Sequence, residues 1–95
     1  MSKKEAYQQK VEAQLDELNA EIDKLKAKAK KSSADAKIEY QDQIDDMQAK
    51  QKAVRKKFDE VKSASEGAWE DVKSGLDSAY NNLEDAVKRA SSRFG

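Results

Sequence analysis

The chain has 95 residues, which is enough for one domain, and 40% of them are charged while 37% are hydrophobic. Nineteen basic and nineteen acidic residues leave no net charge, so electrostatic binding to nucleic acid is not expected. Cysteine and histidine are both absent, which removes a disulfide framework, a thiolate nucleophile and the commonest metal ligand. We therefore expect no enzyme, no cofactor, no metal site and no small-molecule substrate.

The composition predicts an all-α fold. There is no proline, there are only three glycines, and alanine, lysine, glutamate and glutamine are abundant. No alternating run of β-branched residues bounded by turn signals is present. No apolar run approaches membrane-spanning length, and the opening MSKKE does not resemble a signal peptide, so we expect a cytoplasmic protein.

In the first two thirds of the chain, apolar residues recur at alternating spacings of four and three. This spacing is typical of a coiled-coil seam, and it is interrupted by a polar residue at Gln51. The predicted interaction seam consists of Val11, Leu15, Leu18, Ile22, Leu25, Ile44, Met47, Val54, Phe58 and Val61.

Residues 28–36 interrupt the seam and allow two interpretations. In the first, the helix continues, since no Gly, Pro or Asn is present to make a turn. In the second, the three lysines end one helix and Ser32 or Ser33 caps the next. We expect continuity, and hence a long coiled-coil helix from about residue 3 to about residue 62. The alternative is a three-helix bundle with breaks near 32 and 65.

A second break is predicted at 63–67. Ser63 followed by Glu66 matches a capping box, and Gly67 loosens the backbone beside it. We expect a shorter amphipathic helix from about residue 64 to about residue 92, which folds back on the first.

This C-terminal segment repeats an apolar pattern every eleven residues, so that Trp69 corresponds to Tyr80 and Leu76 to Val87. Eleven residues complete three turns at about 3.67 residues per turn, which places these side chains on one nearly straight stripe. The predicted docking face consists of Trp69, Val72, Leu76, Tyr80, Leu83, Val87 and Phe94.

The side of this helix opposite the docking face is mainly acidic. Helices that lie on membranes usually display Lys and Arg there. We therefore expect the docking face to pack on other helices, with weak membrane-surface contact as the alternative.

The whole chain resembles the small bacterial coiled-coil-domain proteins of about this length. The matching segments are KKEAY, QLDELNAEIDKLKAKA, DAKIEYQDQI and AWEDVKSGLDSAYNNLEDAVKRASSRF. The resemblance implies a helical architecture, continuous through residues 28–36, and no particular activity.

Residues 68–94 are also similar in pattern to the eleven-residue repeats of exchangeable apolipoproteins, synucleins and late-embryogenesis-abundant proteins. That resemblance implies reversible association with lipid or a role in desiccation.

Together these patterns predict a non-catalytic structural or interaction protein, a scaffold or adaptor that acts through helix–helix association. The alternative is a peripheral lipid-surface or stress-protective protein that binds through 68–94. If the last helix packed only against 36–62, the apolar stripe of residues 11–25 would face water. A helix with such a stripe is marginal alone, so we expect self-association or a helical protein partner.

Overall fold

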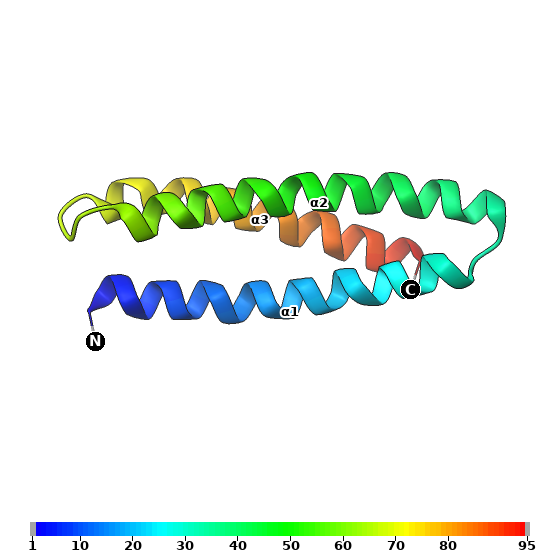
Figure 1. Ribbon diagram of the computed structural model, residues 1–95, viewed down its shortest axis with the longest axis horizontal. Coiled ribbons are helices and arrows are strands. Elements are labelled where there is room, and N and C mark those ends of the chain that lie inside the picture. The colour runs from blue at the N-terminus through cyan, green and yellow to red at the C-terminus, as the bar shows by residue number, and fades with distance from the viewer. Residues whose placement is uncertain (1, 95) are drawn as a thin grey trace.

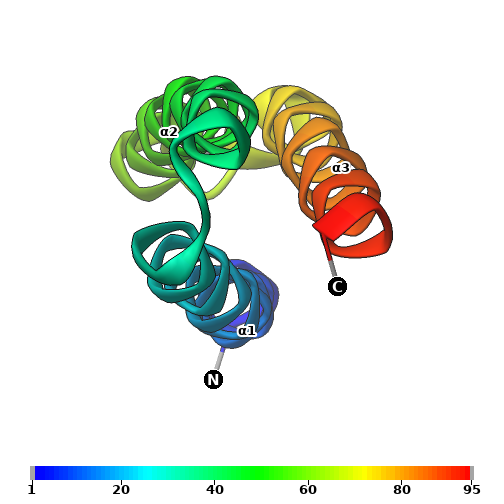
Figure 2. The same ribbon diagram turned by 90° about the vertical axis from the view of Figure 1, so that its right-hand side faces the viewer.

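Three helices lie side by side along the long axis of the computed structural model, which describes residues 2–94 (Figure 1). α1 spans Lys3–Lys31, α2 spans Ala34–Ser63 and α3 spans Trp69–Phe94. Successive helices run in opposite directions, and a view along the bundle places them at the corners of a triangle (Figure 2). The body measures 51 × 19 × 17 Å. The prediction of an all-α fold is confirmed.

The predicted continuous helix from residue 3 to residue 62 is wrong. α1 ends at Lys31 and α2 begins at Ala34, so the chain adopts the alternative arrangement, a three-helix bundle with breaks near 32 and 65. The resemblance to small bacterial coiled-coil-domain proteins also implied an unbroken helix through residues 28–36, and this implication is wrong as well.

Two serine side chains explain this break. The backbone N–H and the Oγ of Ser32 both donate to the carbonyl of Ala29, at 3.2 and 2.7 Å, and close the end of α1. The Oγ of Ser33 accepts the N–H of Ala36 at 3.3 Å and caps the start of α2. Both serines have extended backbone, which any residue adopts, so the turn requires no glycine, proline or asparagine.

The second break lies at 64–68, one residue later than predicted. Ser63 still belongs to α2, so the expected capping box does not begin α3. Instead, the N–H groups of Ala68 and Trp69 both donate to the carbonyl of Ser65 at 3.0 Å, and α3 begins at Trp69.

The two apolar surfaces predicted separately form one core, because all three helices turn their apolar faces inward. Leu15, Phe58, Val72, Tyr80 and Phe94 are half-buried at its margin. The buried core consists of Val11, Leu18, Ile22, Leu25, Tyr40, Ile44, Met47, Val54, Val61, Trp69, Leu76, Leu83, Ala86, Val87 and Ala90. Most of the stripe of residues 11–25 is therefore covered within one chain, and Leu15 is the member of it that stays half-buried.

The N-terminal end of α1 is fastened to the rest of the bundle by polar and aromatic contacts. Lys4 Nζ donates to the carbonyls of Lys62, at 2.9 Å, and Ala64, where α2 ends. The ring of Tyr7 lies 5.7 Å from that of Trp69, and its hydroxyl donates to the carboxylate of Asp77 on α3. At the opposite end, stacked aromatic rings of α2 and α3 close the core.

Candidate functional site: a groove between α1 and α2

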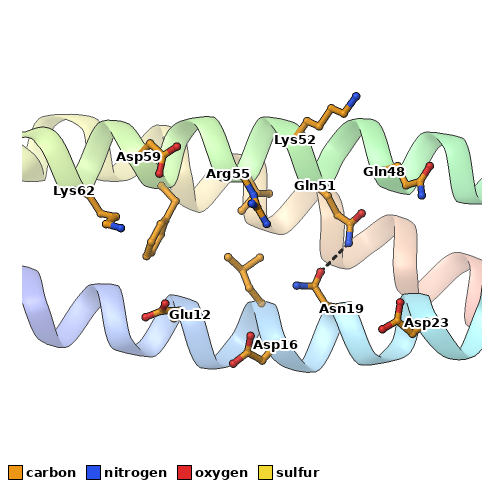
Figure 3. Close-up of a pocket in the computed structure, with 13 residues that line it drawn as sticks. Glu12, Asp16, Asn19, Asp23, Gln48, Gln51, Lys52, Arg55, Asp59 and Lys62 are labelled. Atoms are coloured by element: carbon orange, nitrogen blue, oxygen red, sulfur yellow. Dashed lines mark hydrogen bonds between the residues drawn. The ribbon is translucent and has the colours of Figure 1, made fainter.

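A groove of about 950 Å³ runs between α1 and α2, and its lining comes from these two helices alone. Figure 3 shows it with α3 lying behind. The helices are antiparallel, and the contact between Asn19 and Gln51 sets their register. Residue 16 therefore lies level with residue 54, and residue 12 with residue 58.

The floor of the groove is apolar. Val54 is 1% exposed and belongs to the core, whereas Leu15 and Phe58 are half-buried and reach the surface. All three lie on the predicted seam. Leu15 and Phe58 are thus members of that seam that the three-helix arrangement leaves incompletely covered.

A hydrogen bond between two side-chain amides crosses the groove. Gln51 Nε2 donates to Asn19 Oδ1 at 2.7 Å, and Figure 3 shows the two side chains pointing toward each other. The sequence indicated Gln51, because it interrupts the seam. Asn19 was not indicated, since it lies one residue beyond the apolar position Leu18 and reads as part of the polar face.

The two walls of the groove carry opposite charge. The wall on α1 presents Glu12, Asp16 and Asp23, and its lining includes no basic residue. The wall on α2 presents three basic side chains and one acidic one. These are Lys52, Arg55, Lys62 and Asp59. Arg55 and Lys62 point toward the gap, whereas Lys52 points away from α1 (Figure 3).

These walls do not neutralise each other within the chain. Among residues 2–94, no ion pair connects the acidic wall of α1 with the basic wall of α2. The groove therefore keeps both rows of charge available to a partner.

The predicted docking face of α3 is not a free surface. Leu76 and Leu83 are completely buried, and Trp69 is only 6% exposed. At the end of the face, the ring of Phe94 stacks on Tyr40 with centroids 4.0 Å apart. This face is occupied by helices of its own chain.

A smaller hollow of about 390 Å³ lies between α2 and α3, and its lining is polar. Two of its cations have acidic partners, since Lys50 pairs with Asp46 at 2.6 Å and Arg93 pairs with Glu39 at 3.3 Å. The third, Arg89, donates to the carbonyl of Asp85 at 3.3 Å. The hollow offers little apolar surface to a partner, so the groove between α1 and α2 is the better candidate.

Two tyrosines show a perturbed acidity. Burial, followed by the hydrogen bond and the charge of Asp77, raises the pKa of Tyr7 above its ordinary range. Burial, followed by the charge of Glu84, raises the pKa of Tyr80. Both phenols are therefore protonated at neutral pH and act as hydrogen-bond donors.

The comparisons with known proteins gave no match to this chain among family models, curated protein sequences or solved structures. The resemblance to small bacterial coiled-coil-domain proteins stays a prediction. Within residues 2–94, no cluster of three or more acidic side chains is placed to hold a metal ion. None of the three helices is long and apolar enough to cross a membrane.

Proposed function

We propose that this chain is a non-catalytic interaction protein of the cytoplasm, a scaffold or adaptor that binds a helical partner in the groove between α1 and α2. The observation that carries the proposal is the pair Leu15 and Phe58, which remain half-buried between two rows of charge. An apolar strip with a charged rim is the usual anatomy of a protein interface. The high charge and the lack of histidine and cysteine support a role without catalysis.

A photoreactive phenylalanine analogue placed at position 58 tests this proposal in living cells. We expect a cross-link to another polypeptide from position 58. The matched control places the analogue at Ile38, which is 66% exposed on the same helix but outside the groove. Equal labelling from both positions, or no polypeptide adduct from position 58, would refute the groove as an interaction site.

The alternative function, contact with a lipid surface through 68–94, requires the bundle to open, because its apolar residues lie in the core. Trp69 is the only tryptophan and reports this directly. We expect the blue emission of a buried indole, unchanged when vesicles of anionic lipid are added. A change in emission and in helix content on addition of vesicles would favour the alternative.

A further inference from the structure

We propose that the occupant of the groove is a second copy of this chain, related to the first by a two-fold axis parallel to the helices. This inference rests on the proposed function and names its partner. The arrangement sets the α1–α2 faces of two copies against each other, so that these four helices surround a shared apolar centre. The argument depends on the charges of the walls, the shape of the floor and the net charge of the chain.

The symmetry axis decides which walls meet. Rotation about an axis along the helices places α1 of one copy over α2 of the other, at the same level. Rotation about an axis across the helices would place α1 over α1 and α2 over α2. The first arrangement brings the acidic wall onto the basic wall twice, whereas the second brings like charges together. Opposed like charges at an interface are strongly unfavourable, so the first arrangement is favoured.

The levels of the individual side chains agree with this arrangement. Asp16 of one copy comes opposite Arg55 of the other, because residues 16 and 54 lie level within each chain. Glu12 lies about one helical turn from Lys62 of the other copy, a distance that a lysine side chain spans. Asp59, the one acidic residue in the basic wall, lies level with Glu12, so the arrangement also opposes these two carboxylates. Arg55 and Lys62 lie about one turn away on either side of Asp59 and reduce this repulsion.

The apolar floor is also self-complementary. Leu15 and Phe58 lie about one turn apart along the groove, and the two-fold axis brings both pairs together in the centre of the four helices. Each copy covers the apolar surface that the other leaves half-buried. The zero net charge of the chain adds no long-range repulsion between copies.

The contact is short, about three helical turns on α1 and about four on α2, so the dimer belongs to the weak and reversible class. Sedimentation equilibrium up to about 100 μM covers the affinities expected of such an interface. Added salt weakens the dimer, because the rows of charge lie at the rim of the groove.

Two charge reversals test the arrangement. Both Asp16 and Arg55 are exposed, so Asp16→Lys and Arg55→Glu leave the core intact, and circular dichroism checks that each variant stays helical. Each variant alone juxtaposes like charges twice per dimer, and we expect its self-association to weaken by about tenfold or more. In an equimolar mixture, the introduced lysine of one variant would face the introduced glutamate of the other. We expect the mixture to dimerise as the unmodified chain does.

An unmodified chain that stays monomeric throughout the concentration range would overturn the inference, as would a dimer that neither substitution weakens. Failure of the mixture to recover would overturn it too. The cross-link from position 58 separates this inference from the proposed function. An adduct of twice the chain mass supports both. An adduct with a different polypeptide alone leaves the proposed function standing and removes the second copy as partner.

Discussion

The amide of Gln51 donates a hydrogen bond to Asn19 at 2.7 Å and joins α2 to α1 beside an otherwise apolar seam. A direct polar contact between two half-buried side chains fixes the register of an antiparallel helix pair, because any shift along the axis breaks it. The register in turn determines which charges of the two walls lie level.

We expect the two residues to be energetically coupled. In a double-mutant cycle with Asn19→Ala and Gln51→Ala, the coupling should be about 0.5–1.5 kcal/mol, the usual net contribution of a hydrogen bond. The matched control is the exposed pair Gln41 and Asp45, one turn apart on α2 at 2.8 Å, for which a few tenths of a kcal/mol are expected. Urea denaturation of the four chains in each cycle measures both values. Equal coupling in the two cycles would contradict a special role for the cross-helix pair.

Ser33→Ala tests the break between α1 and α2 by the sign of its effect. The substitution removes the oxygen that accepts the N–H of Ala36, so we expect a loss of about 1 kcal/mol of stability. In a continuous helix the same change would stabilise, since alanine is the better helix former. Ser63→Ala, in the last turn of α2, serves as the control and should be neutral or slightly stabilising. Thermal or urea unfolding followed by circular dichroism distinguishes these outcomes.

Gly75→Ala should stabilise the protein. Gly75 lies inside α3, and a Cβ added there would meet the side-chain Cδ of Lys57 at 3.5 Å, an ordinary van der Waals contact. The gain in helix propensity over glycine is about 0.5–1 kcal/mol. Urea denaturation checks it, with the exposed Ser78→Ala on the same helix as a reference for propensity alone. A destabilised Gly75→Ala variant would mean that the helices approach more closely at this position than the structure has them.

The stability of the bundle should depend on the protonation of Tyr7 at high pH. Its pKa is raised in the folded chain, so the unfolded chain releases its proton first as the pH increases. The stabilisation that protonated Tyr7 contributes to the fold is therefore complete below about pH 10, the ordinary pKa of tyrosine, and it decreases above that pH.

Tyr7→Phe removes both the hydrogen bond to Asp77 and the titrating phenol. At pH 7 we expect the variant to be less stable by about 1 kcal/mol, and this deficit should shrink as the pH rises past about 10. Urea denaturation of both proteins at a series of pH values measures the difference. A deficit that is constant with pH would show that folding does not raise the pKa of Tyr7, and the absence of any deficit would show that Tyr7 contributes by ring packing alone.

Much of the fold follows from apolar periodicity. The spacing of Val11 to Val61 and the eleven-residue repeat identify nearly every core position, because a side chain repeated on one side of a helix must be buried against something. The break at Ser32 and Ser33 does not follow from it, because the usual signs of a turn are residues that favour left-handed backbone. Here two serines in extended backbone make the turn through hydrogen bonds of their side-chain oxygens. Apolar periodicity does not indicate such hydrogen bonds.

The candidate site was harder to predict. The seam includes Leu15 and Phe58, but periodicity cannot distinguish a position that is fully covered from one that is half-covered, since this depends on where the third helix lies. The docking face from Trp69 to Phe94 was correctly recognised as an apolar surface. Its partner, however, is the rest of its own chain. Contacts such as that of Lys4 with Ala64 join residues that only the folded chain brings together.

Because the bundle contains an odd number of helices, Ser2 and Phe94 lie toward opposite ends of a body 51 Å long (Figure 1). Tension applied to these two ends would act along the helices. It would slide α1 and α3 past α2, so that all their side-chain contacts with α2 carry the load at once. If both ends of the chain lay at the same end of the bundle, tension would instead separate the helices one contact at a time. With this connectivity, a pull on the two ends loads the helix–helix contacts in shear, which is the geometry of a spacer that resists stretching.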